Sequence, residues 1–217
     1  MPDAVIFDLD GVLADSERLW SEAKEALTRE TGGTWRDEAP AAMLGMSSPE
    51  WSRYLHDELG VPLEPGEITS RVVARMVVLY RERHPVYPGA PESVRAISAR
   101  WPVGLASSAN REIIELFLEV SGLAGRFAAT VSSEEVAHGK PAPDVYIEAA
   151  RRIGVPASGC VAVEDSSNGL RSAAAAGMMV IAVPSPDYPP AEDALALAGL
   201  RVKGIAEVTP ALIERAT

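Results

Sequence analysis

Cysteine is almost absent from this chain of 217 residues, which contains only Cys160. A single cysteine cannot form an internal disulfide, and nothing else in the sequence indicates a zinc site. The sequence also lacks an uninterrupted apolar stretch of membrane length, and its first apolar run, from Ala4 to Phe7, is broken at once by Asp8. We therefore expect no signal-peptide core, no membrane partner and a cytoplasmic location.

Positive charge is also scarce. The chain has 20 Lys and Arg residues against 31 Asp and Glu residues, which gives a formal net charge of −11. Nucleic acids are bound mainly through clustered Lys and Arg, so we expect no nucleic-acid partner. Because 47% of the residues are hydrophobic, the chain can build an interior and is not expected to be disordered. We expect a monomer or a weak homo-oligomer.

Short apolar runs that end in polar residues alternate along the chain with helical patterns. A run that is apolar on both faces is typical of a central strand in a parallel sheet. Helical stretches with a single apolar stripe, at 110–120 and 144–153, lie between such runs. The predicted strands are 4–7, 103–106, 160–163 and 179–183, with a weaker candidate at 128–132. This order predicts an α/β fold with a doubly wound, mainly parallel sheet.

The stretch from Ser16 to His84 breaks the alternation, because it contains only helical patterns. We predict one helix over about 16–30, a second with Ser48 as N-cap and Pro49 at its first position, and a third over about 67–83. Prolines and a glycine in 84–91 favour a defined linker. These features predict an inserted α-helical cap domain of residues 16–85 and a Rossmann-like core domain of residues 1–15 and 86–217.

Acidic residues follow two of the predicted strands. Asp8 and Asp10 are two residues apart in an extended segment, so their side chains face the same way. Glu164 and Asp165 end another buried strand, and the carboxyl ends of parallel strands lie along one edge of the sheet. Any one of these acids taken alone would fit a solvated loop, but two such pairs favour a common site. Oxygen ligands without His or Cys suit a hard divalent ion such as Mg²⁺.

Potential anion-binding residues follow the other strand ends. Ser107 and Ser108 close a strand just before a helix, so hydroxyls and helix N-terminal amides would point to the same edge. Asn110 is predicted to cap that helix. Lys140 lies among a glycine and prolines that fix its backbone, which favours a fixed bound anion, although a lysine in a turn can also be simply solubilising.

These residues resemble, in order and spacing, the four motifs of the haloacid dehalogenase superfamily. The helical insertion resembles the mobile cap of the subgroup that holds β-phosphoglucomutase and many small-metabolite phosphatases. The matching segments are Phe7 to Ser16, Ser107, Gly139 to Asp144 and Val163 to Gly169.

The resemblance implies phosphoryl transfer through a covalent intermediate. Asp8 would attack phosphorus and form an aspartyl phosphate, and Asp10 would act first as general acid and then as general base. Mg²⁺ would be held by Asp8, the main-chain carbonyl of Asp10 and Asp165, with Glu164 as a further ligand or as support. The oxygens of the phosphate would be held by Ser107 and Lys140.

We expect a Mg²⁺-dependent phosphatase that acts on a small phosphorylated metabolite, plausibly a sugar phosphate or a phosphoglycolate-like ester. Dehalogenases that resemble this group lack the second aspartate of the first motif, so Asp10 argues against that activity. Mutases of the subgroup carry a histidine where Trp20 aligns and basic residues around 43–49, which are missing here. A β-phosphoglucomutase-like hexose phosphomutase is the alternative, and a catalytically silent phosphometabolite-binding protein is a third possibility.

The first cap helix and the turn before Ser48 would face the site when the cap closes. Several residues of this helix and turn could equally well pack inside the cap instead of contacting the substrate. The candidates for substrate specificity are Glu17, Arg18, Trp20, Met46, Ser47 and Arg53.

Overall fold

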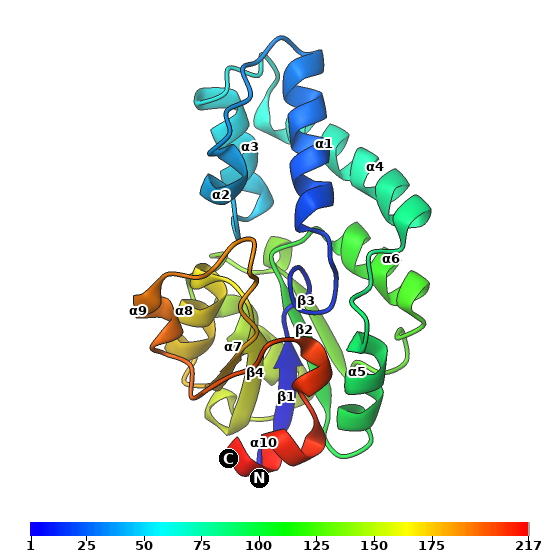
Figure 1. Ribbon diagram of the computed structural model, residues 1–217, viewed down its shortest axis with the longest axis vertical. Coiled ribbons are helices and arrows are strands. Elements are labelled where there is room, and N and C mark those ends of the chain that lie inside the picture. The colour runs from blue at the N-terminus through cyan, green and yellow to red at the C-terminus, as the bar shows by residue number, and fades with distance from the viewer. Residues whose placement is uncertain (217) are drawn as a thin grey trace.

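The structure, a computed structural model, describes residues 1–216 and contains one six-stranded sheet with helices on both sides (Figure 1). All neighbouring strands are parallel, in the order β3-β2-β1-β4-β5-β6, which confirms the predicted α/β class and places the first strand inside the sheet. The strands are β1 (Ala4–Phe7), β2 (Val103–Ser107), β3 (Ala129–Ser132), β4 (Cys160–Glu164), β5 (Met179–Ala182) and β6 (Leu200–Arg201).

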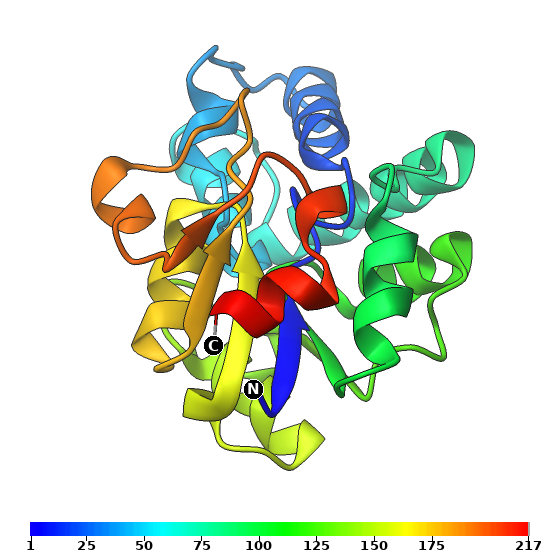
Figure 2. The same cartoon turned by 60° about the horizontal axis from the view of Figure 1, so that its bottom comes forward.

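Alternate residues of the central strands supply the two faces of the sheet. Val5 and Phe7 pack in a cluster with α5 (Ala90–Ser98), α6 (Arg111–Ser121) and α10 (Pro210–Ala216). Ala4 and Ile6 pack in a second cluster with α7 (Asp144–Ile153), α8 (Ser167–Ala175) and α9 (Glu192–Leu195). Figure 2 shows the sheet between these layers. Burial on both faces explains why β1, β2 and β4 read as continuous apolar runs.

The strand register brings the polar strand ends together. Phe7 is opposite Leu105 of β2 and Val163 of β4. The backbone N–H of Asp8 still donates to the carbonyl of Val163, at 3.0 Å. Asp8, the end of β2 and the end of β4 therefore lie side by side at one edge of the sheet.

Of the five helices between β1 and β2, all but α5 stand above that edge (Figure 1). This helical insertion consists of α1 (Glu17–Glu30), α2 (Ala39–Ala42), α3 (Ser48–Asp57) and α4 (Pro65–Arg83). Both α1 and α3 pack against α4, and α4 also packs against α6. The buried apolar residues of the insertion form one continuous cluster with those on the Val5 face of the sheet.

Some predicted boundaries were wrong. Ser47, not Ser48, caps α3, and it forms a reciprocal capping box with Glu50. The linker ends at Gly89, because Pro91 lies in the first turn of α5. The sequence did not indicate α2, α5, α9, α10 or β6. In residues 1–216, no helix is both long and apolar enough to cross a membrane.

Candidate active site

A buried lysine joins the ends of β1 and β4. Lys140 Nζ lies 2.6 Å from Asp8 Oδ1 and 2.5 Å from Glu164 Oε1, and its side chain is 2% exposed. Burial alone would lower the pKa of Lys140, but the charges of Asp8 and Glu164 outweigh that effect and raise the pKa above its usual value. Lys140 is therefore a buried cation held by two carboxylates.

Asp165 completes an acidic cluster beside this lysine. Carboxylate oxygens of Asp8, Glu164 and Asp165 lie within 4.8 Å of one another, and all three residues are buried. Oδ1 of Asp165 has no hydrogen-bond partner among the described residues. Burial raises the pKa of Asp165 well above its usual value, and the charges of Glu164 and Asp8 raise it further. A buried, unpartnered carboxylate oxygen next to other carboxylates fits a hard divalent cation.

Both oxygens of Glu164 are already bound by protein donors. Oε1 accepts from Lys140 Nζ and from Tyr146 OH, the latter at 2.8 Å. Oε2 accepts from the backbone N–H of Asp165 at 2.9 Å. A Cβ at Gly169 would lie 1.9 Å from this carboxyl group, so glycine is needed there. Glu164 is thus held rigidly and is turned toward Lys140.

Asp10 is held from the helical insertion. Its Oδ1 accepts a hydrogen bond from Trp20 Nε1 of α1, at 3.0 Å, and a short one from the hydroxyl of Ser16. Burial raises the pKa of Asp10, whereas these two hydrogen bonds lower it. Burial also raises the pKa of Asp8 well above its usual value, although Lys140 opposes the shift. The two aspartates predicted to share a space thus differ in their partners.

The loop after β2 forms another wall of the site. The Ser107 hydroxyl accepts from the backbone N–H of Ala109, at 3.0 Å, and the Ser107 side chain is fully buried. Ser108 faces the insertion, where its hydroxyl donates to the carbonyl of Gly45 at 3.4 Å. Ser48 Oγ of α3 donates to Asn110 Oδ1 at 2.8 Å. This loop therefore touches the helical insertion at two points.

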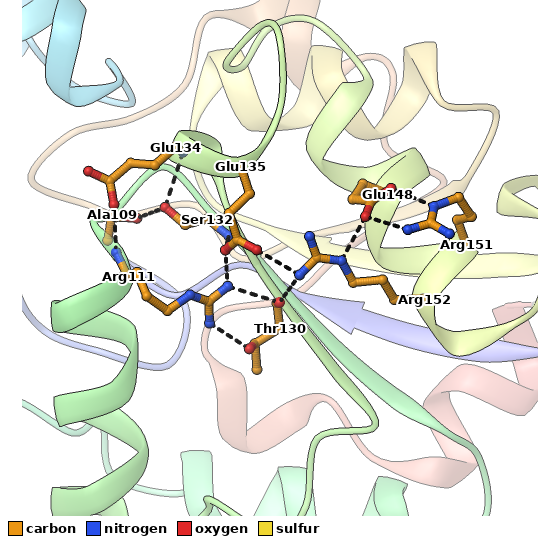
Figure 3. A network of polar contacts seen from close by, with 9 residues as sticks. All are labelled: Ala109, Arg111, Thr130, Ser132, Glu134, Glu135, Glu148, Arg151 and Arg152. Atoms are coloured by element: carbon orange, nitrogen blue, oxygen red, sulfur yellow. Dashed lines mark hydrogen bonds and ion pairs between the residues drawn. The ribbon is translucent and has the colours of Figure 1, made fainter.

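Asn110 is the N-cap residue of α6, as predicted, but its side chain does not bond the N–H groups of that helix. Glu134 does so instead, because its carboxylate accepts from Asn110 Nδ2 at 2.6 Å and from the N–H of Arg111 at 2.9 Å. Figure 3 shows how the guanidinium groups of Arg111 and Arg152 converge on Thr130 and Glu135. This network braces the loop after β2 through Asn110 and Arg111.

The site residues line a small cavity of about 50 Å³, which is room for a few waters. It lies between the sheet edge and the insertion. Its lining includes Asp8 and Asp165 of the acidic cluster and six other predicted site residues, namely Asp10, Glu17, Trp20, Met46, Ser108 and Lys140. Ser107 and Glu164 lie behind this lining.

Three predicted specificity residues are not among the lining residues. Arg18 instead pairs with Asp187, at 2.6 Å, on the exposed surface. Ser47 caps α3, and its hydroxyl bonds Glu50 at 2.5 Å. Arg53 is exposed, and its Nε donates to a backbone carbonyl of the same helix.

Sequence reasoning missed Lys24, Trp51 and Tyr146. Lys24 and Trp51 line the cavity, and Tyr146 supports Glu164 from behind. Lys24 follows Glu17 by two helical turns and Trp20 by one, so helical spacing placed it on the same face of α1. Trp51 and Tyr146 gave no comparable signal, because each also fits the apolar stripe of its own helix.

Known proteins share both the sequence pattern and this fold. The family model for haloacid dehalogenase-like hydrolases matches residues 2–177. Hexitol phosphatase B from Escherichia coli is 34% identical over 212 residues, which cover 95% of this chain and 94% of that protein. Probable pseudouridine-5'-phosphatase from Drosophila melanogaster is 34% identical over 188 residues, which cover 83% of this chain and 81% of that protein.

A solved structure shows the same architecture. CbbY from Rhodobacter sphaeroides, in complex with phosphate, has a TM-score of 0.85 and 29% identity, and the match covers 96% of each chain. The family match extends from β1 to the end of α8 and so includes all the residues of the acidic cluster and Lys140. The chain therefore belongs to the haloacid dehalogenase-like hydrolase family.

Proposed function

We propose that this protein is a Mg²⁺-dependent phosphatase that hydrolyses the monoester of a small phosphorylated metabolite through an aspartyl phosphate on Asp8. The observation that carries the proposal is the buried Lys140 bridge between Asp8 and Glu164, next to the unpartnered oxygen of Asp165. The relatives named as phosphatases support the same reaction class.

Asp8 is the proposed nucleophile. Lys140 binds only its Oδ1, and Asp8 lines the cavity, so the second carboxylate oxygen is available for attack on phosphorus. In the first step an Asp8 oxygen bonds to phosphorus while the bond from phosphorus to the ester oxygen breaks. The ammonium of Lys140 stays in place to stabilise negative charge on the phosphoryl oxygens. Ser107 and Ser108 are the proposed further phosphate-binding residues.

Asp10 is the proposed proton donor and acceptor. Its raised pKa favours a protonated carboxyl group that gives its proton to the leaving ester oxygen. The resulting carboxylate then takes a proton from the water that attacks the phosphorus of the aspartyl phosphate. That water breaks the bond between phosphorus and Asp8, releases inorganic phosphate and restores both aspartates.

The residues present fit a Mg²⁺ ion. Asp8, the main-chain carbonyl of Asp10 and Asp165 would hold it, because the Asp165 oxygen has no partner in the described chain. Glu164 would hold Lys140 rather than the ion, since protein donors occupy both of its oxygens. When bound, Mg²⁺ would neutralise charge on Asp8 and on the phosphoryl oxygens.

Residues 16–85 are the proposed cap domain. The cavity lies between the sheet edge and this domain, so movement of the cap away from the sheet edge would admit the substrate. The movement would occur in the two connecting segments, residues 11–16 before α1 and residues 84–89 after α4. The reclosed cap excludes bulk water from the site.

The test is phosphate release from a panel of phosphorylated sugars, sugar alcohols, acids and nucleotides, with Mg²⁺ or with chelator. We expect release that needs Mg²⁺ and that falls at least about 1,000-fold in Asp8→Asn, since a nucleophile is lost. Acid quench with ³²P-labelled substrate should trap label on the wild-type protein but not on that variant. Absence of release from the whole panel would refute the phosphatase, and isomerisation that needs a hexose bisphosphate would identify a mutase.

A further inference from the structure

Lys24 is a buried cation that the proposed chemistry does not use. It lies on α1 and is 7% exposed. Its Nζ lies 5.4 Å from the ring centroid of Trp20 and 5.1 Å from that of Trp51. No residue of 1–216 accepts a hydrogen bond from this ammonium group, which carries three donors. The two indole rings stabilise its charge but do not supply acceptors.

Glu17 lies on the same face of α1, and it also lines the cavity. Within the described chain, no side chain or backbone N–H donates a hydrogen bond to its carboxylate. Burial raises the pKa of Glu17 to about 7, and burial lowers the pKa of Lys24 to about 8. Lys24 and Glu17 thus both face the cavity without a hydrogen-bond partner among the described residues.

The charges around Lys24 favour an uncharged ligand. The carboxylate of Glu17 already offsets the charge of Lys24, so a second anionic group would find no unbalanced positive charge there. A hydroxyl group can accept from Lys24 and donate to Glu17 at the same time. The faces of Trp20 and Trp51, 6.1 Å apart between centroids, offer apolar surface to the carbon chain that carries such hydroxyls.

We infer that Lys24 is a specificity-determining residue that, together with Glu17, binds hydroxyl groups on the non-phosphate part of the substrate. The inference rests on the proposed function, because it assigns the specificity of that phosphatase. The protein selects phosphomonoesters of neutral polyhydroxyl compounds over phosphorylated carboxylic acids and bisphosphates.

Three phosphate esters separate the effects of the core site from those of Lys24. Sorbitol 6-phosphate and 6-phosphogluconate have the same carbon chain, but the first ends in a hydroxyl group and the second in a carboxylate. Methyl phosphate has no hydroxyl group and reports on the core site alone. We expect the wild-type kcat/KM to rank sorbitol 6-phosphate first.

The test variant is Lys24→Met, which keeps the length of the side chain between the indole rings but removes its charge and donors. We expect kcat/KM for sorbitol 6-phosphate to fall roughly 10- to 100-fold, as for the loss of a charged hydrogen bond. The kcat/KM for methyl phosphate should fall at least about 5-fold less than that for sorbitol 6-phosphate, since methyl phosphate does not reach Lys24. Glu17→Gln, which keeps the shape of the side chain, should show the same pattern.

Lys203→Met is the matched control, because Lys203 is exposed and lies outside the cavity. This variant should have the wild-type kcat/KM for every ester. Equal losses for sorbitol 6-phosphate and methyl phosphate in Lys24→Met, or no loss for either, would overturn the inference while leaving the phosphatase intact. Preference of the wild type for 6-phosphogluconate or for fructose 1,6-bisphosphate would also overturn it. Failure of the wild type to hydrolyse any ester would instead refute the proposed function.

Discussion

Replacing Lys140 by methionine should strongly destabilise the metal-free protein. Lys140 Nζ is within 2.6 Å of carboxylate oxygens of both Asp8 and Glu164, and all three side chains are at least nine-tenths buried. Methionine leaves two buried carboxylates without their cation. Breaking a buried ion pair by removing one partner costs about 3–5 kcal/mol, and methionine of similar size leaves little cavity to add to that cost.

Urea denaturation in chelator at pH 7.5 measures this loss. With a denaturant slope of about 3 kcal/mol per molar, the midpoint should fall by roughly 1–1.7 M. Lys203→Met removes the same charge from an exposed position and should shift the free energy of unfolding by less than about 0.5 kcal/mol. Circular dichroism of both variants before denaturation verifies that each is folded.

The loss of stability in Lys140→Met should also depend on pH. Burial already raises the pKa of Asp8 in the folded protein above its unfolded value. Such a group contributes stability at low pH, and this contribution is lost as the pH rises through the folded pKa. Removal of Lys140 raises that pKa further, so the gap between wild type and variant should widen from pH 5.5 to pH 8. A gap that is absent at pH 7.5, or that narrows as the pH rises, would refute the reasoning.

Three further outcomes follow from the same geometry. Saturating Mg²⁺, at about 100 times its Kd, should stabilise the wild type by about 2.7 kcal/mol. Its binding should also release protons, measured by calorimetry, because the pKa of Asp165 is raised without metal. Asp165→Asn should lose both effects. Gly169→Ala should displace Glu164 and lower kcat at least about 10-fold, whereas Gly66→Ala, with open space at its Cβ, should not. Trp20→Phe removes a hydrogen bond that lowers the pKa of the proposed general acid, so the alkaline limb of the kcat profile should move to higher pH; an unmoved limb would contradict that role.

The sequence predicted the sheet and its acidic edge well because few physical rules govern them. A strand buried on both faces, such as Cys160–Glu164, reads as an apolar run, and parallel strands place their polar ends together. β6 (Leu200–Arg201) was missed, because two partly exposed residues at a sheet edge give no such run. The capping box of α3 was present in the sequence as Ser47 and Glu50, but the adjacent Ser48 offered an equally good N-cap.

The partners of the site residues could not be predicted, since they depend on tertiary packing. Asn110 has the sequence position of an N-cap, yet it bonds Ser48 and Glu134, which come from distant segments. Arg18 and Lys24 both lie on α1 and both carry a positive charge, but only Lys24 lines the cavity. The rotation of α1 about its axis decides between them, and that rotation is fixed by its packing against α4.

In the proposed mechanism, helix α1 joins substrate selection to proton transfer. Trp20 of this helix orients Asp10, and Lys24, one turn later and about 6 Å along the axis, faces the same cavity. A substrate that binds Lys24 therefore also holds α1 in the position where Trp20 reaches Asp10. Contacts with the non-phosphate part of the substrate would then raise the rate of the chemical step as well as the affinity for the substrate. Loss of Lys24 should accordingly lower kcat for sorbitol 6-phosphate as well as raise its KM.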